Sequence, residues 1–298
     1  MTDRRLRDTT APAMAALIVS AMAFGATFVV VKDALDDIPP VALVGWRFLI
    51  GAIALLALSF PIRTTLWRDG AIAGVWLFAG YALQTAGLQT TGATNSALIT
   101  GLYVVFTPIV VAIWNRRPPI AWVVAGAVIA FLGLVLLTVE EGFSFGRGDL
   151  LTVACALGFA GHIAYLSRRA RFHPVVPFTG VQLLTTSVLA FAWSSVLEGP
   201  QLPKVDVVPA LLGLGLGVSA VAYLLQVWAQ TRIGPSKTAM VLSLEPVFGV
   251  IFGAALLGER LDLKGWIGAL VIVAAIQVVL ANEPEDEVLA AEGVAPAG

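Results

Sequence analysis

The sequence has few of the residues that catalysis or cofactor binding requires. Its 298 residues include one cysteine and two histidines, and only 12% are charged. It lacks a Gly-x-x-x-x-Gly-Lys-Ser/Thr loop for ATP, a cluster of cysteines or histidines at metal-ligand spacing, and the residues of a hydrolytic triad. The single Cys155 excludes an internal disulfide. We therefore expect a protein that is not an enzyme, has no cofactor or metal, and draws energy for any work from gradients.

Apolar residues, in contrast, make up 58% of the chain, which is more than a soluble core of this size can use. They form ten runs of about 20 residues, the length of a helix that crosses a bilayer. The sequence therefore predicts an all-α, polytopic membrane protein with ten transmembrane helices. The runs are 12–32, 40–60, 69–90, 95–115, 119–139, 149–168, 175–197, 207–230, 235–257 and 264–281.

The two halves of the chain repeat each other. Segment 45–49 aligns with 180–184 at an offset of 135, and later positions align at an offset of 142. The pairs at the second offset include Tyr81 with Tyr223, Gln84 with Gln226, Gly92 with Gly234, Ala97 with Ala239, Gly126 with Gly268 and Ala127 with Ala269. Because five helices are an odd number, the second copy crosses the membrane in the opposite sense, and such inverted repeats are typical of alternating-access transporters.

These patterns predict the organisation and orientation of the chain. We expect an N-terminal segment 1–11, a first five-helix repeat 12–139, a second repeat 149–281, and a disordered acidic tail 282–298. With the N-terminus inside, twelve Lys and Arg residues lie on the inner side and five on the outer side, so both termini are expected in the cytoplasm. The N-terminus also resembles a cleavable secretory signal, but its apolar run continues to Val31, and cleavage would leave one repeat a helix short.

Two motifs carry a family resemblance within this ten-helix frame. The segment Pro40–Arg47, and Leu244–Phe248 followed by Leu257–Leu261, resemble the EamA-type drug/metabolite transporter superfamily, and the resemblance covers nearly the whole chain. The first copy departs from it, because Asn115, Arg116 and Arg117 stand where a Gly-Glu pair is expected. The resemblance implies a multi-pass protein of the bacterial cytoplasmic (inner) membrane that exports small metabolites, often amino acids, from a central cavity between the repeats. Some members, of the YddG type, export aromatic amino acids.

The expected partners follow from this resemblance. They are a small-molecule substrate such as an amino acid and membrane lipid, with no nucleic acid, and the chain is expected to be a monomer. Three alternatives stay open: an exporter of a nucleoside, sugar or drug-like compound, a non-transporting membrane scaffold, and a membrane-embedded enzyme.

Polar residues inside the predicted spans are the candidate substrate-binding residues. Tyr223 and Gln226 share one helix face, and Tyr81 and Gln84 repeat it in the other half. Such a face either lines a hydrated cavity or forms hydrogen bonds that pack the helices together. Tyr103 and Trp228 are candidate walls for an aromatic cargo. His162 is a further candidate, with a hydrogen-bonded role in the core as the alternative.

Two charged residues within the spans are candidates for gating or coupling. Arg47 either snorkels or forms a fixed ion pair, or it anchors a substrate carboxylate or acts as a gate. Glu245 either carries protons or has a structural role as a cap or as a partner of Arg47 or Lys237. Pro108 and Pro246 are predicted hinges, because a proline removes a backbone hydrogen bond.

Overall fold

The computed structural model describes residues 2–34, 37–57, 59, 62–90, 96, 99–138, 146–199, 202–257 and 263–282. The regular structure of these residues is entirely helical, which confirms the predicted fold class. The acidic tail and the run Gly258–Leu261 lie outside the described residues. The elements are α1 (Thr2–Ala34), α2 (Pro40–Leu56), α3 (Thr64–Leu88), α5 (Tyr103–Asn115), α6 (Ala121–Thr138), α7 (Arg147–Arg169), η1 (Ala170–Phe172), α8 (Val175–Leu197), η2 (Val205–Val207), α9 (Val208–Leu212), η3 (Gly213–Ala222), α10 (Tyr223–Gln230), α11 (Pro235–Leu242), α12 (Glu245–Leu257) and α13 (Leu263–Asn282).

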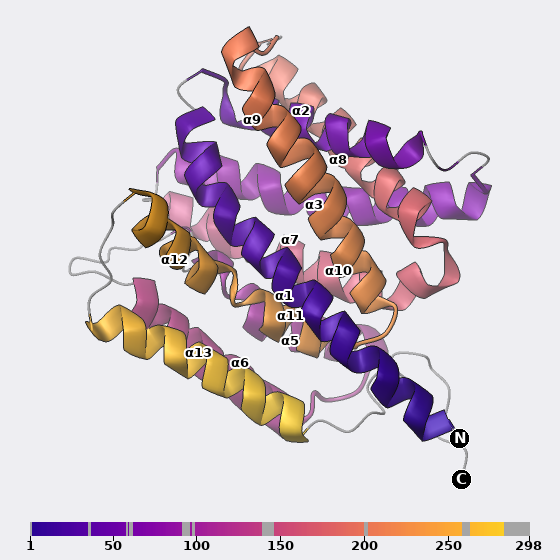
Figure 1. Cartoon of the computed structure of the whole chain (residues 1–298), viewed down its shortest axis with the longest axis vertical. Helices are drawn as coiled ribbons and strands as arrows, with labels where there is room; N and C mark the ends of the chain where they lie inside the picture. The colour runs from indigo at the N-terminus through magenta and orange to yellow at the C-terminus, as the bar shows by residue number, and fades with distance from the viewer. Residues whose placement is uncertain are drawn as a thin grey trace.

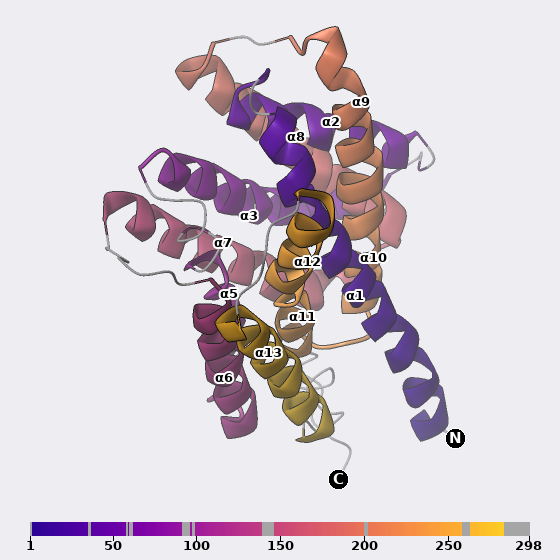
Figure 2. The ribbon, with the colours of Figure 1, turned by 60° about the vertical axis from the view of Figure 1, so that its left-hand side comes forward.

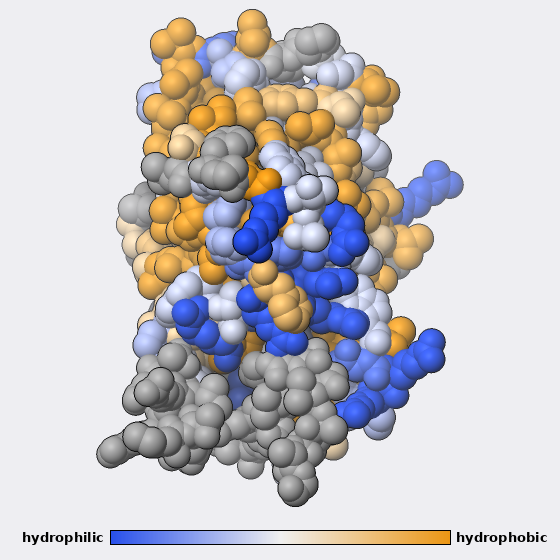
Figure 3. Space-filling model, turned by 90° about the vertical axis from the view of Figure 1, so that its right-hand side faces the viewer, coloured by the Kyte–Doolittle hydropathy of each residue, from blue (hydrophilic) through white to orange (hydrophobic). Residues whose placement is uncertain are grey.

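The helices are suited to a lipid environment. Five helical stretches of the described chain are long and apolar enough to cross a membrane, and four shorter helices are also apolar. In Figure 3, hydrophilic residues gather in one region of the face shown, beside broad hydrophobic areas. A surface of this kind needs lipid as its solvent, because large exposed apolar areas are unfavourable in water.

Equivalent helices of the two repeats pack against each other in opposite directions. Gly45, near the start of α2, lies against Phe191 near the end of α8, and Gly180, near the start of α8, lies against Leu56 at the end of α2. Gly180 and Phe191 are the counterparts of Gly45 and Leu56 at the offset of 135, so each contact is a copy of the other. The repeats are therefore related by a two-fold axis that inverts one relative to the other.

Equivalent helices of the two repeats also pack in opposite directions at the other end of the molecule. There α6 and α13, which are also equivalent, pack along each other, with Gly126 against Val279 and Gly133 against Gly268. Figure 1 and Figure 2 both show this pair at one end, α2 and α8 toward the other, and α1, α10, α11 and α12 between them. The central region of the fold is thus enclosed by helices from both repeats.

The expected continuous helices over 95–115 and 235–257 are both interrupted. A turn at Gly101 and Leu102 precedes α5, and a turn at Ser243 and Leu244 separates α11 from α12. These turns are equivalent at the offset of 142, so the interruption belongs to both repeats. Pro246 occupies the second position of α12, where its missing N–H breaks no helical hydrogen bond. Each turn starts a new helix, at Tyr103 in one repeat and at its counterpart Glu245 in the other.

Candidate functional site

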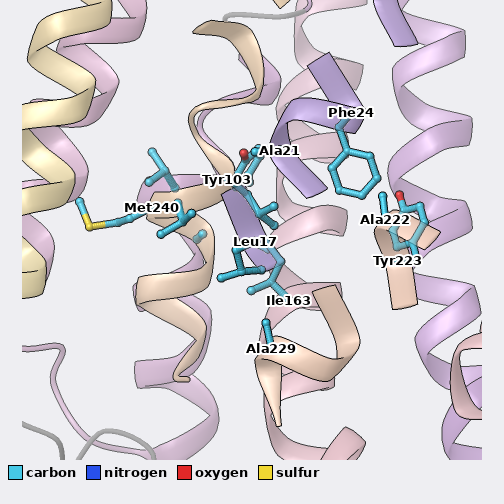
Figure 4. Close-up of a cluster of buried hydrophobic side chains, with 14 of the residues drawn as sticks. Leu17, Ala21, Phe24, Tyr103, Ile163, Ala222, Tyr223, Ala229 and Met240 are labelled. Atoms are coloured by element: carbon cyan, nitrogen blue, oxygen red, sulfur yellow. The ribbon is translucent and has the colours of Figure 1, made fainter. Parts of the chain in front are cut away.

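A pair of tyrosines marks the centre of the molecule. The hydroxyl oxygens of Tyr81 on α3 and Tyr223 on α10 are 2.9 Å apart. Because these two residues are counterparts in the repeats, their contact lies at the two-fold axis, which in an inverted repeat runs at mid-depth in the membrane. Phe24 of α1 packs on Tyr223 with ring centroids 5.0 Å apart (Figure 4), and its counterpart Phe159 of α7 packs on Tyr81 at 5.4 Å.

Arg47 of α2 reaches this tyrosine pair. Its Nε donates to Ser219 Oγ at 3.2 Å and its Nη2 donates to the Tyr81 hydroxyl at 3.5 Å. The guanidinium carbon lies 5.0 Å from the Phe48 ring centroid and 5.5 Å from that of Tyr81, within the range of cation–π attraction. Arg47 is only 4% exposed, so it does not snorkel to the interface. Among the described residues, no carboxylate lies within ion-pair distance of it.

The position equivalent to Arg47 is neutral. Gln182 of α8 places its Oε1 2.9 Å from His162 Nε2, and both residues are buried. The His162 ring lies 6.2 Å from that of Tyr223, so this pair borders the same centre. The arrangement matches the alternative in which His162 is a hydrogen-bonded core residue. The positive charge near the two-fold axis therefore comes from one repeat only.

The two glutamines of the predicted polar face have different surroundings. Gln226 is 2% exposed and donates to Gln230 Oε1 at 3.2 Å, while Gln230 Nε2 donates to Ile163 O and Ser167 Oγ on α7, both at 2.8 Å. The two bonds of Gln230 join α10 to α7, whereas the bond of Gln226 stays within α10, and the role of Gln226 in substrate binding stays a prediction. Gln84 is half-buried and donates to Thr100 Oγ1 at 3.1 Å. The role of Gln84 and Tyr81, which are both partly exposed, stays a prediction.

The interrupted helices bring two more candidates to the centre. Tyr103 is 6% exposed, and its hydroxyl has no hydrogen-bond partner among the described residues. Its counterpart Glu245 is partly exposed, begins α12, and interacts electrostatically with Arg47 without an ion-pair contact. A carboxylate in the first turn of a helix is stabilised by the helix dipole. Arg47 and Glu245 therefore bring a guanidinium and a carboxyl group to one central region.

Trp228 and the two predicted hinge prolines do not contact the tyrosine pair in the interactions of the described residues. Trp228 is on α10 about one and a half turns beyond Tyr223, and the Arg232 guanidinium lies 4.0 Å from its ring centroid and donates to its carbonyl oxygen. This arrangement is typical of an interfacial anchor. Pro108 is buried inside α5, and its role as a hinge, like that of Pro246, stays a prediction.

Sequence reasoning missed several residues of the centre. Ser219, the partner of Arg47, lies in η3, a π-helical stretch, and its counterpart at the offset of 142 is Leu77, so the repeat gives no signal for it. A π-helical segment frequently marks a functional site. Phe24 and Phe159, by contrast, are aligned phenylalanines at the offset of 135, and that match was a signal for them.

We predict that Gly25 controls how closely α1 approaches the start of α12. A Cβ atom at Gly25 would lie 2.7 Å from Glu245 O and Gly249 N, which are backbone atoms and cannot turn away. We expect Gly25→Ala to lower the free energy of unfolding by about 1 to 3 kcal/mol, measured by thermal or denaturant unfolding in detergent. Gly217→Ala is the matched control, because its Cβ would have no neighbour within 4 Å. Equal stability of the two variants would contradict the tight contact.

The chain matches the EamA-like transporter family twice, over residues 11–139 and 146–281. It belongs to the EamA-like transporter family. An uncharacterized transporter of Archaeoglobus fulgidus is 33% identical over 268 residues, covering 88% of this chain and 84% of that protein. The uncharacterized inner membrane transporter YedA of Escherichia coli is 25% identical over 288 residues, covering 90% of each chain. A crystal structure with 20% identity has a TM-score of 0.77 over 90% of this chain and 98% of its own, which shows the same fold.

This membership makes the protein a membrane transporter with the ten-helix, two-repeat fold. The two relatives named above are called transporters, but neither name gives a cargo. Fold alone does not determine cargo either, so the substrate has to be inferred from the residues of the central region.

Proposed function

We propose that this EamA-like transporter exports small metabolites that carry a carboxylate, above all amino acids, across the bacterial cytoplasmic membrane. The observation that carries the proposal is Arg47, a buried guanidinium near the two-fold axis whose hydrogen bonds in the described part of the chain go to the neutral groups of Ser219 and Tyr81. A buried charge that no carboxylate contacts directly is costly, and that cost falls when the carboxylate of a cargo binds it. The forked guanidinium suits a carboxylate, which it can bind through two hydrogen bonds.

The surroundings of Arg47 fit the rest of an amino acid. Glu245 offers a carboxylate for an ammonium group, and it lies close enough to Arg47 to interact electrostatically. The half-buried Phe159 supplies aromatic surface next to Tyr81, so an apolar or aromatic side chain would be accommodated. Neutral hydroxyl groups dominate the remaining polar atoms. One guanidinium, one carboxyl group and several neutral hydroxyl groups suit a zwitterion better than a multiply charged solute.

The symmetry of the centre supports alternating access as the mechanism. Tyr81 and Tyr223 meet at the axis that relates the two repeats, which is where one repeat would move against the other. The turns before Tyr103 and Glu245 interrupt two equivalent helices at the same place, so that half of each can move without the other half. We propose that a single chain is the transport unit and that both termini face the cytoplasm, as the distribution of Lys and Arg indicates.

A counterflow experiment tests the substrate class. The purified protein in liposomes is preloaded with one unlabelled compound, and uptake of its labelled form is measured for a panel of amino acids, nucleosides and sugars. We expect exchange of amino acids and no exchange of neutral sugars, because only the former bring a carboxylate to Arg47. Esters of the exchanged amino acids, which lack the carboxylate, serve as matched controls. Exchange of sugars or nucleosides without exchange of any amino acid would overturn the proposal.

A further inference from the structure

Two exposed arginines are held close together near the start of α3. Arg68 Nε donates to Asp69 Oδ1 at 3.2 Å, and Arg169 Nε lies 3.9 Å from Asp69 Oδ2. His173 Nε2 lies 3.0 Å from the same Oδ2. The Asp69 side chain is 5% exposed, whereas those of Arg68 and Arg169 are 65% and 45% exposed. A buried carboxylate from the first repeat thus positions two guanidinium groups, one from each repeat, at the surface.

These contacts leave the outer ends of both guanidinium groups available. Both arginines face Asp69 through Nε, and no described residue accepts a hydrogen bond from the Nη groups of either one. Two positive charges and one negative charge leave this group with a net charge of +1. Because the Nη groups of arginine match the oxygens of a phosphate, the pair is suited to bind a phosphate from two sides.

The two arginines lie at the level of the lipid headgroups. They flank the start of the apolar run 69–90 and the end of the run 149–168. Trp67, next to Arg68 in the chain, and Phe172, on η1, are both exposed. Trp and Tyr at the ends of spans mark the membrane–water interface, where the phosphates of lipids also lie. By the distribution of Lys and Arg, this end is the inner one.

The connections between helices at the inner end have almost no carboxylates. They hold nine Lys and Arg residues and one acidic residue, Asp69, whereas the outer connections hold five Lys and Arg residues and ten acidic residues. The inner connections are 57–69, 115–121, 167–175 and 230–238, and the outer ones are 32–40, 88–96, 138–150, 197–207 and 257–265. Lys and Arg determine the orientation of a membrane protein, and Asp and Glu contribute little to it. Orientation therefore does not explain the missing carboxylates, but a negatively charged partner surface does, because it would repel them.

The fold itself does not require the charged group. The counterparts of Asp69 and His173 at the outer end are Leu211 and Ile38, at the offsets of 142 and 135. These two residues belong to one hydrophobic cluster, and each is 2% exposed. The inverted repeats thus build the same place twice, once with ionisable side chains and once without them. Its charges at the inner end call for a partner that is found on that side.

We propose that Arg68 and Arg169 bind the phosphate of an anionic phospholipid, such as phosphatidylglycerol, in the cytoplasmic leaflet. The Nη groups of both arginines donate to the phosphate oxygens, and the exposed Trp67 and Phe172 offer apolar surface to the lipid. The net charge of +1 matches a headgroup with one negative charge better than a zwitterionic one. The choice of leaflet rests on the orientation in the proposed function, whereas the lipid site itself is independent of the cargo.

A lipid suits this place better than a soluble phosphate compound. The guanidinium groups are largely exposed, and an ion pair between exposed groups contributes little by itself. A soluble anion would therefore bind weakly here. A phospholipid is already confined to the membrane plane with its phosphate at this level, which gives it a high effective concentration. The anionic lipids of the cytoplasmic leaflet are in addition attracted to clusters of Lys and Arg.

The test measures lipid binding without any cargo. The purified protein, in a neutral detergent with about 0.15 M salt, is titrated with phosphatidylglycerol or with phosphatidylcholine. The rise of the thermal unfolding temperature with the mole fraction of lipid gives an apparent dissociation constant for each. We expect phosphatidylglycerol to bind at least about fivefold more tightly than phosphatidylcholine. Equal affinities would overturn the proposal.

The double variant Arg68→Gln, Arg169→Gln should weaken binding of phosphatidylglycerol about 30-fold, since each cation near a lipid surface contributes about fivefold. Arg116→Gln with Arg117→Gln is the matched control, because it removes the same charge from exposed residues that do not contact Asp69. We expect a loss of about twofold or less for this control, since charges farther away than a Debye length are screened. Equal losses in the two double variants would show general attraction to the surface and overturn the site.

Two further measurements separate the fork from the charge and the lipid from a free ion. Arg68→Lys with Arg169→Lys keeps both charges but loses the forks, and an intermediate affinity is expected. Millimolar inorganic phosphate should not displace phosphatidylglycerol, and displacement would assign the site to a soluble anion instead. If phosphatidylglycerol is preferred while no compound in the counterflow panel exchanges, the proposed function fails and the lipid site stands.

Discussion

The substitution Arg47→Gln is expected to lower amino acid counterflow about 100-fold, because it removes the only described cation at the two-fold axis. Glutamine is the informative replacement, since Gln182 occupies the equivalent position in the second repeat and the fold accommodates it there. Initial exchange rates in liposomes, at equal amounts of reconstituted protein, measure the effect. Arg47→Lys keeps the charge but loses the forked geometry, and an intermediate rate is expected for it.

The stability of the same variant distinguishes binding from structure. If Arg47 binds a cargo carboxylate, the empty protein carries a buried guanidinium that no carboxylate of the described residues contacts directly, and Arg47→Gln leaves the free energy of unfolding unchanged or raises it. If Arg47 instead holds the fold together, the variant loses about 1.5 to 3 kcal/mol for each hydrogen bond that the charged guanidinium makes to Ser219 and Tyr81. Thermal unfolding with and without cargo separates the two cases. Lost transport together with a large loss of stability would contradict the anchoring role.

The substitution Glu245→Gln is expected to abolish the response of cargo flux to an imposed pH gradient, while exchange without a gradient continues at a lower rate because the proposed partner of the cargo ammonium group is lost. Glutamine keeps the shape of the side chain at the start of α12 but cannot release or bind a proton there. For one-to-one exchange with protons, a gradient of one pH unit drives about tenfold accumulation of cargo. We expect this accumulation in the unmodified protein and none in the variant, as measured with labelled cargo in liposomes.

Tyr103→Phe is the matched control for this experiment. Tyr103 begins the equivalent helix α5, and the substitution removes a hydroxyl that has no hydrogen-bond partner among the described residues. The pH response should therefore survive in this variant. A response that persists in Glu245→Gln would place the coupling group elsewhere, and no response in the unmodified protein would make it a uniporter.

The fold could be predicted from the sequence because the patterns that determine it extend over many residues. Ten apolar runs of spanning length and two sets of aligned residues leave few arrangements for the helices. The contact between Tyr81 and Tyr223 also follows from them, since counterparts on facing helices meet at the axis. The turns before Tyr103 and Glu245 were not foreseen. One begins with Gly101 and the other with Ser243, so the two repeats share no local signal for the interruption.

The sequence could not predict which polar side chains form hydrogen bonds with each other. The spacing of Gln226 and Gln230 is the same whether they face water or the carbonyl oxygen of Ile163, so periodicity could not choose between cavity and packing. Asp69 and His173 lie 104 positions apart, one at the start of a span and one in a connection. Only the three-dimensional packing of α3 on α7 and α8 brings them together.

The reciprocal contacts of Gly45 with Phe191 and of Gly180 with Leu56 suggest how two separate copies of one repeat could pair. A chain with five helices would already carry both surfaces needed to recognise a second copy inserted upside down, and the tyrosine at the axis would touch its own duplicate. In such a homodimer every substitution is made twice. Fusion of two such copies into one gene would end that constraint, and it would allow Arg47 to differ from Gln182 and Asp69 from Leu211, as they do in this chain.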